Sequence, residues 1–396
     1  MRIGIDARLA WRRGVGTYTA NLLLALSRVD PYNDYVVFSA PPELKQAIPS
    51  KRFRFLDPVS EPSPRFIRMM SRQPAFYEQF WLPSMLAKHD LDLLHYTDNS
   101  ATATADIPYV VTIHDTMFLR PLGKAYPHAT TKQRLVGFYK KAVVPLAARG
   151  AMAVITVSEY SSQCIVKELG VAPEDVHVTP EGVDLAFFHP PHRKKKGKKG
   201  IPTILVHGAE DERKNMANLL QAASLLIKKG RPVTLTVAGM DERGMERAGL
   251  MRLARDRGLI PHLQLLGDVS RQLLREVYYK ADVFLYASRW EGFGLPVLEA
   301  FACGVPTVVS NTSSLPEVAG DAALQVSPDK PEEMARAVER LLTRPALARQ
   351  LVRKGLARVQ QFTWDRTARM TLGVYRKVAL SMEYDRHGRR RATVEE

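Results

Sequence analysis

Two glutamates on either side of a glycine-rich stretch are the residues of this sequence whose types and spacing best predict chemistry. Glu291 and Glu299 have seven residues between them, and the apolar run at 283–287 just upstream predicts a buried parallel strand. Pro296 has the fixed φ favoured at the first position of a helix, so we expect a strand, a turn and a helix start here. The residues that join this strand to this helix are Gly292, Phe293, Gly294 and Leu295.

The predicted turn suits a ligand with both phosphate and hydroxyl groups. Gly292 and Gly294 let the backbone adopt positive φ and approach a ligand closely. The helix start offers N–H groups and the positive end of its dipole to a diphosphate. Carboxylates accept hydrogen bonds from neighbouring hydroxyls, as in a ribose or a hexose. The stretch therefore predicts a sugar-nucleotide site, although two glutamates alone would favour a capped, solvated helix start.

A pair of cations follows the strand expected at 203–207. Arg213 and Lys214 would place fixed positive charge beside a leaving diphosphate and so stabilise charge as it develops. An exposed turn, with an ion pair to Glu210 or Glu212, is the alternative. Backbone groups after a further strand, at 263–266, could contact the nucleobase; the residues concerned are Gly267 and Val269.

The first half of the chain has a glycine turn of its own. Gly14 and Gly16 follow the strand expected at 2–7, and such a turn before a helix can cradle phosphate. The dinucleotide fingerprint G-x-G-x-x-G fails because Thr19 occupies its third glycine position, which argues against an NAD-dependent oxidoreductase. A simple tight turn between strand and helix is the alternative.

One histidine stands where a functional residue is expected. His114 and Asp115 come at the carboxyl end of the strand expected at 109–114, and open α/β sheets place ligand-facing residues at that end. Most lone histidines are structural or surface residues, so position rather than residue type favours a functional role for His114.

Predicted strands alternate with predicted helices along both halves, and several strands are continuous apolar runs, as in parallel sheets covered on both faces. The strands are expected at 2–7, 35–40, 52–57, 91–97, 109–114, 151–158, 176–179, 203–207, 233–238, 263–266, 283–287, 307–309 and 324–326. Helices of the first half are expected near 17–28, 75–88, 131–148 and 159–168. The pattern predicts an α/β fold with two Rossmann-like, doubly wound domains.

The domain limits follow from a lysine-rich stretch that can bury almost nothing. We expect the two domains at 1–185 and 203–363, joined by a basic linker at 186–202. A crossing helix at 364–385 and a basic tail at 386–396 complete the chain.

The stretch 289–300, continued through 303–306 and 313–320, resembles the signature of the retaining GT-B glycosyltransferases called glycosyl transferases group 1. The resemblance covers essentially residues 1–380, and it implies two domains that face a central cleft. Arg-Lys-Asn at 213–215 resembles a branch of mannosyl- and glucosyltransferases. The chain departs from one common pattern at Ala209, where many relatives have an arginine.

The resemblance also implies roles for single residues. Glu291 would face the donor sugar, and Glu299 would bind the ribose of the nucleotide. His114 would lie beside the donor sugar at the reaction centre, and the glycine turn at 14–16 would face the donor diphosphate and the acceptor. The acceptor contacts that we expect are Asp115 and Tyr18.

These features predict a retaining, metal-independent glycosyltransferase without a cofactor. It would move a hexose, mannose before glucose, from a nucleoside diphosphate sugar such as GDP-mannose to a hydroxyl of a glycan or glycolipid. Retention in this family is usually described as front-face attack, so we nominate no enzymic base. The alternatives are another GT-B activity, such as an epimerase or a phosphorylase, and a non-catalytic basic protein that binds a surface or nucleic acid.

The formal net charge of +16 is concentrated in two segments. Residues 186–202 hold six Lys or Arg and residues 386–391 hold four Arg, without an acid in either, which leaves 47 basic against 41 acidic residues elsewhere. No recognition motif accompanies this charge, so specific nucleic-acid binding is not expected. A solvated linker and tail explain these segments, and so does attraction to an anionic membrane surface.

A basic amphipathic helix is expected in the part of the chain where the resemblance is weakest. Arg65, Arg68 and Arg72 have i, i+3, i+7 spacing beside apolar residues. A membrane-facing acceptor entrance is one interpretation, and ordinary core packing of the neighbouring aromatic residues is the other.

Cysteine content and hydropathy predict the compartment. Cys164 and Cys303 form no disulfide framework in a chain of 396 residues, which favours a reducing environment. The first residues lack the apolar core of a signal peptide, and no apolar run approaches the ~18 residues of a membrane span. We expect a cytoplasmic protein, either free or peripheral on the inner face of the membrane.

Overall fold

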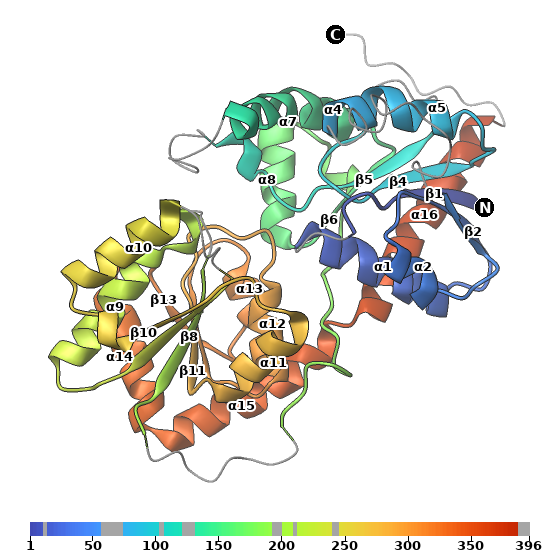
Figure 1. Ribbon diagram of the computed structural model, residues 1–396. Coiled ribbons are helices and arrows are strands. Elements are labelled where there is room, and N and C mark those ends of the chain that lie inside the picture. Colours follow the sequence, from blue (N-terminus) through green and yellow to red (C-terminus); the bar gives the residue numbers. More distant parts are fainter. Residues whose placement is uncertain are drawn as a thin grey trace. The chain divides into compact units, whose positions relative to one another are not determined.

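The computed structural model describes residues 1–10, 14–56, 74–102, 107–120, 131–191, 200–208, 212–239 and 245–386. Within these residues the chain forms two compact units, drawn in Figure 1. The first takes in the described residues of Met1–Leu119, Thr130–Glu181 and Trp364–Glu396, and the second those of Arg120–Ala129 and Gly182–Thr363. The expected basic helix at 65–72, the lysines of 193–199 and the tail from 387 onward lie outside the described residues.

A seven-stranded parallel sheet forms the centre of the first unit, in the order β3-β2-β1-β4-β5-β6-β7. Its strands are β1 (Arg2–Asp6), β2 (Asp34–Phe38), β3 (Phe53–Leu56), β4 (Leu93–Tyr96), β5 (Tyr109–Thr112), β6 (Ala153–Thr156) and β7 (Val176–Val178). Its helices are α1 (Val15–Val29), α2 (Pro42–Ala47), α4 (Pro74–Phe76), α5 (Leu82–Leu86), α7 (Thr131–Gly150), α8 (Glu159–Leu169) and α16 (Trp364–Arg386). A π-helical segment, Tyr77–Trp81, joins α4 to α5.

Both faces of this sheet are covered, as its continuous apolar strands predict. Leu94 and Tyr96 of β4 enter the apolar core shared with α5, α7 and α8. His95 lies between them and faces the opposite side, where its Nδ1 is 2.6 Å from the hydroxyl of Tyr375 in α16. Figure 1 shows α1 and α16 together on that side. The last helix of the chain is thus part of the first unit's fold.

A six-stranded parallel sheet forms the centre of the second unit, in the order β10-β9-β8-β11-β12-β13. Its strands are β8 (Thr203–His207), β9 (Thr234–Ala238), β10 (Leu263–Leu266), β11 (Val283–Tyr286), β12 (Thr307–Ser310) and β13 (Leu324–Val326). Its helices are α9 (Met216–Lys228), α10 (Met245–Asp256), α11 (Arg271–Lys280), α12 (Leu295–Ala302), α13 (Leu315–Ala319), α14 (Pro331–Thr343) and α15 (Pro345–Arg358). In Figure 1, α9, α10 and α14 cover one face, and α11, α12 and α15 the other.

The predicted fold class is confirmed, because both sheets are parallel and doubly wound. In each sheet the winding reverses at one place, between β1 and β4 in the first unit and between β8 and β11 in the second. Ligands of such sheets bind outside the carboxyl ends of the strands at this switch point. The loops after these four strands are therefore where a site is expected.

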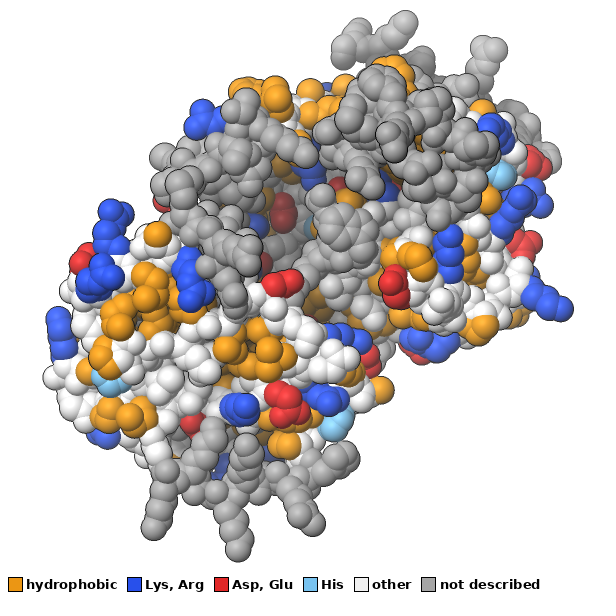
Figure 2. Space-filling view, in the orientation of Figure 1, with side chains coloured by type: hydrophobic (Ala, Val, Ile, Leu, Met, Phe, Trp, Pro, Cys, Tyr) orange, Lys and Arg blue, Asp and Glu red, His pale blue; other side chains and the backbone are white. Residues whose placement is uncertain are grey.

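The distribution of surface charge and the hydropathy of the helices complete the description. Figure 2 shows Lys and Arg side chains dispersed over the described surface in view, without one broad basic patch. Among the described helices, none has both the length and the apolar composition that crossing a lipid bilayer requires.

Candidate active site

An ion pair connects the loops that follow β8 and β11 in the second unit. The Nζ of Lys214 lies 2.6 Å from Oε1 of Glu291 and 2.6 Å from the hydroxyl of Tyr286, at the end of β11. The Tyr286 hydroxyl in turn donates to the same Glu291 oxygen at 2.8 Å. The structure thus brings together two predicted site residues, and it adds a tyrosine that sequence reasoning missed.

The electrostatics of this cluster keep both members of the pair ionised. Burial raises the pKa of Glu291, but Lys214 and Arg213 lower it more, so its pKa lies below the usual range. Burial lowers the pKa of Lys214, but Glu291 and Tyr286 raise it more, so its pKa lies above the usual range. Because these side chains are only 17% and 13% exposed, solvent screens their charges weakly.

Hydrogen bonds from neighbouring loops fix the backbone around Glu291. Its N–H donates to Oγ of Ser313 at 3.2 Å, and Oγ of Ser314 donates to its carbonyl at 3.0 Å. Asn215, next to Lys214, donates through Nδ2 to the carbonyls of Ala287 at 3.0 Å and Pro328 at 2.6 Å. Asn215 has φ 60°, a conformation that asparagine tolerates better than most residues. These bonds hold the loops in one arrangement.

Gly294 has the positive φ that the sequence predicts for this turn, whereas Gly292 does not. Gly294 precedes α12 with φ 121°, and a Cβ at this position would lie 2.7 Å from Cδ2 of Leu315, so only glycine fits. The helix begins at Leu295, one residue before Pro296. Phe293 is buried with its ring against Phe362, so its side chain is a packing element of this turn.

Glu299 lies in α12 and is held by a tyrosine of α11. The hydroxyl of Tyr278 donates to Oε2 of Glu299 at 3.0 Å, and Nε2 of His207 lies 3.1 Å from the same hydroxyl. Tyr278 is fully buried, and His207 ends β8. Neither residue was predicted, because each stands in a segment that periodicity identifies only as helix or strand. Both orient a carboxylate that was predicted.

The predicted nucleobase contacts lie in the loop after β10. The carbonyl of Gly267 accepts a hydrogen bond from the N–H of Gly239 at 3.2 Å, and Val269 is buried. Their contact with a base stays a prediction.

In the first unit, His114 forms a buried pair with a residue that the sequence did not single out. Its Nδ1 lies 3.5 Å from Oε1 of Glu181, and both side chains are less than 10% exposed. Its Nε2 lies 3.0 Å from the carbonyl of Thr97, which can only accept, so this nitrogen carries a hydrogen. Burial lowers the pKa of His114, but the bond to Glu181 and its charge raise it more, so the net shift is upward.

Tyr18 packs against His114 from α1. Its ring meets the imidazole edge-on with the centroids 4.8 Å apart, and its hydroxyl lies 3.2 Å from Oγ1 of Thr112. The side chain is fully buried, so in the described structure it offers no exposed surface to an acceptor. Tyr18 supports His114, and its role as an acceptor contact stays a prediction.

Asp115 and the glycine turn at 14–16 have local structural partners. The carboxylate of Asp115 accepts a hydrogen bond from the N–H of Met117 at 2.9 Å and so caps the short 3₁₀ turn that follows. Gly14 precedes α1 with φ 72°, and a Cβ on Gly16 would lie 2.2 Å from the carbonyl oxygen of Leu9. Backbone geometry therefore requires these glycines, and their ligand roles stay predictions.

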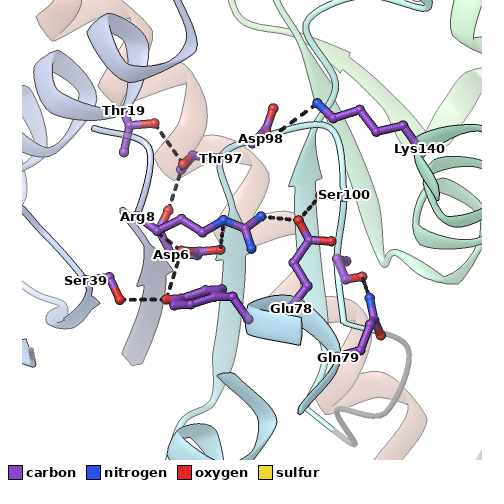
Figure 3. A network of polar contacts seen from close by, with 12 residues as sticks. Asp6, Arg8, Thr19, Ser39, Glu78, Gln79, Thr97, Asp98, Ser100 and Lys140 are labelled. Carbon is purple, nitrogen blue, oxygen red and sulfur yellow. Dashed lines mark hydrogen bonds and ion pairs between the residues drawn. The ribbon is translucent and has the colours of Figure 1, made fainter. Parts of the chain in front are cut away.

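A polar network, drawn in Figure 3, lies at the carboxyl ends of β1 and β4. The guanidinium of Arg8 pairs with Asp6 at 3.5 Å and with Glu78, and all three side chains are nearly buried. Ser100 donates to Glu78 at 2.7 Å, and Lys140 of α7 lies 3.7 Å from Asp98. No pattern in the sequence indicates this network, because Glu78 lies in a helical segment without a motif.

Glu181→Gln is expected to lower the pKa of His114, because it removes the charge that outweighs burial. A raised pKa contributes stability that is present below the unfolded value of ~6.5 and is lost as pH rises through the folded value. The free energy of unfolding of the parent should therefore fall as pH rises from ~6.5 through the folded pKa of His114, and that of the variant should not. Histidine NMR titration and melting curves at several pH values measure both effects. Glu43→Gln, an exposed site of the same unit, is the control; an unchanged His114 pKa in Glu181→Gln would refute the assignment.

Among the described residues, no three His, Cys, Asp or Glu side chains are grouped so that they could hold a metal ion.

Family profiles match the chain in two consecutive parts. The profile described as Glycosyltransferase Family 4 matches residues 12–187, and that of Glycosyl transferases group 1 matches residues 189–358. The chain therefore belongs to the GT-B glycosyltransferases of group 1, as its motifs indicate.

Two relatives are mannosyltransferases. The O-antigen chain mannosyltransferase B of Escherichia coli is 32% identical over 234 residues, which are 57% of this chain and 61% of that protein. The MMP alpha-(1->4)-mannosyltransferase of Mycolicibacterium hassiacum is 32% identical over 235 residues, which are 58% of this chain and 55% of that protein. The match thus spans somewhat more than half the length of these relatives.

Solved structures share the fold at lower identity. Sucrose-phosphate synthase from Thermosynechococcus elongatus has a TM-score of 0.73 and 21% identity, over 96% of this chain and all of that one. Anabaena HepE in complex with UDP and glucose has a TM-score of 0.68 and 17% identity, over 95% of this chain and all of that one. At such identities the likeness establishes the fold alone.

Proposed function

We propose that this protein transfers a hexose from a nucleoside diphosphate sugar to a hydroxyl of a glycan or glycolipid. The observation that carries the proposal is the Lys214–Glu291 ion pair beside Tyr286, because it lies in the loops after β8 and β11, on either side of the switch point. Open α/β sheets bind ligands at this place.

Each group has a defined part in the transfer. Glu299 accepts hydrogen bonds from the ribose hydroxyls, and Glu291 faces the donor sugar. Lys214 and Arg213 stabilise the negative charge that develops on the diphosphate as the glycosidic bond breaks. The start of α12 adds the positive end of a helix dipole. Lys214 is suited to this part because its charge is fixed before the reaction begins.

The transfer proceeds with retention at the anomeric carbon. The acceptor hydroxyl attacks from the face that the diphosphate leaves, and a donor phosphate oxygen takes its proton. His114 supports this scheme in one respect. When protonated beside Glu181, both its ring nitrogens carry hydrogens directed at protein acceptors, so the imidazole has no lone pair with which to act as a base.

Mannose is the hexose that we favour, with glucose next. The Arg-Lys-Asn sequence at 213–215 and the 32% identity to two mannosyltransferases support it. A thermal-shift screen over GDP-, UDP- and ADP-sugars tests the choice. A donor at 100 times its Kd stabilises the folded state by ~2.7 kcal/mol, which raises Tm by about 5–10 °C in a domain of this size. The proposal expects the largest shift with GDP-mannose, and no shift with any donor would contradict it.

Chelation is expected to leave the transfer rate nearly unchanged. Lys214, Arg213 and the start of α12 already supply the positive charge that a metal would provide at the diphosphate. Rates measured in the presence and absence of EDTA check this. A complete loss of transfer in EDTA, restored by Mn²⁺, would show that a metal takes part.

A further inference from the structure

One face of helix α7 presents a row of apolar side chains to solvent. Leu135, Phe138 and Leu146 are 65%, 67% and 64% exposed. With the exposed Ala142 they have i, i+3, i+7, i+11 spacing, which places them along one stripe of the helix. An apolar stripe on a helix ordinarily faces the core, so a stripe turned to solvent needs a separate explanation.

A fourth large side chain joins this stripe from the neighbouring segment. Phe80 is 68% exposed, and the adjacent Gln79 donates through Nε2 to the hydroxyl of Tyr139 in α7 at 2.8 Å. Four of the nine large apolar side chains that are exposed among the described residues therefore lie in this small area. In Figure 2, hydrophobic side chains line the edge of the first unit where Figure 1 shows α7. We call Phe80, Leu135, Phe138, Ala142 and Leu146 the α7 ridge.

The charged side chains of helix α7 are all cationic. The sequence of α7 holds five Lys or Arg and neither Asp nor Glu. Arg134 and Arg149 are exposed near its two ends, and Lys141 is half-buried beside the ridge. Apolar side chains flanked by cations suit the surface of an anionic bilayer, where the former enter the acyl boundary and the latter meet phosphate groups.

Helix α7 also contacts the polar network of Figure 3, through Tyr139, which is four residues after Leu135 and so borders the ridge, and through Lys140 on the far side of the helix. Tyr139 donates to Glu78, and Lys140 lies 3.7 Å from Asp98. One helix thus contributes side chains both to the ridge and to the carboxyl end of the first sheet. If the proposed transfer function holds, a protein docked through the ridge brings this end of the sheet near acceptors anchored in the same membrane.

We propose that the α7 ridge docks this protein on an anionic phospholipid bilayer. The ridge supplies the apolar contact, and Arg134, Lys141 and Arg149 supply the electrostatic attraction. Docking of this kind is peripheral and reversible, because it relies on a few side chains and on charges that salt screens.

Sedimentation with vesicles tests this proposal. The full chain should pellet with vesicles of phosphatidylglycerol and phosphatidylcholine at low salt, bind vesicles of phosphatidylcholine alone much less, and dissociate as salt rises. Leu135→Gln with Phe138→Gln should weaken binding about tenfold or more. Ile201→Gln with Leu380→Gln is the matched control, because these side chains are 52% and 66% exposed outside the ridge.

Two measurements keep the outcome specific to the ridge. Melting curves should show that the ridge variant is folded, and its affinity for nucleoside diphosphate should equal that of the parent, so a failure here leaves the proposed transfer function untouched. The proposal is overturned if the parent does not bind anionic vesicles, or if the ridge variant pellets as well as the parent. It is also overturned if neutralising the lysines of 193–199 alone abolishes binding, or if the ridge variant changes only the oligomeric state.

Discussion

Lys214→Met should reduce the transfer rate by about 10²–10³-fold, while the protein still binds its donor. The lysine holds a charge next to the developing diphosphate, and removing one such group typically costs ~2.7–4 kcal/mol of transition-state stabilisation. Steady-state kinetics with a chosen donor and acceptor measure the loss. A kcat within a few-fold of the parent would contradict the assignment.

Loss of Lys214 also leaves Glu291 without its cation, so a second variant must separate chemistry from stability. The single variant is expected to lose up to about 3 kcal/mol of unfolding free energy, because the largely buried Glu291 loses its paired cation and keeps only the weaker influence of Arg213. Lys214→Met combined with Glu291→Gln should recover much of that stability and remain inactive. Arg289→Met is the matched control, since Arg289 lies in the same loop as Glu291 but pairs with Asp329 at the surface. It should keep nearly the parental rate.

Glu299→Ala should weaken the binding of nucleoside diphosphate by about 10- to 150-fold. Hydrogen bonds to a charged group contribute ~1.5–3 kcal/mol, and this variant removes the carboxylate proposed to accept them from the ribose. Calorimetric titration with GDP and UDP measures the change. An affinity equal to that of the parent would remove Glu299 from the nucleotide site.

Two companion variants make this result specific. Tyr278→Phe keeps the ring in the core but deletes the hydroxyl that donates to Glu299 at 3.0 Å, so a smaller loss in the same direction is expected. Glu276→Ala removes an exposed carboxylate from the same helix as Tyr278 and should leave the affinity unchanged.

The sequence predicts the fold well because buried parallel strands leave a strong local signal. The apolar run expected at 283–287 is strand β11, Val283–Tyr286, and the run at 263–266 is β10 without any change of limits. Gly294 was also predictable, because a turn between a strand and a helix start often needs the positive φ that glycine adopts most easily. These are properties of a residue and its near neighbours, which a linear pattern records.

Contacts between distant loops leave no such signal. Lys214 and Glu291 are separated by 77 positions, and only the winding of the sheet brings their loops together. In the sequence, Tyr278 is only one apolar position of a predicted helix, and its hydrogen bond to Glu299 becomes visible in the structure alone. No motif connects Glu181 with His114 either. Tyr18 shows the same limit, because no pattern in the sequence reveals that its side chain is fully buried; its role as an acceptor contact stays a prediction.

The most direct test of the proposed function is to follow the anomeric proton by NMR while the purified protein acts on a donor sugar. With GDP-mannose and a simple mannoside, we predict release of GDP and a product whose new linkage has the donor's α configuration. A β linkage would contradict retention. Failure to turn over any GDP-, UDP- or ADP-sugar, by a folded protein that binds none of them, would contradict hexosyl transfer itself.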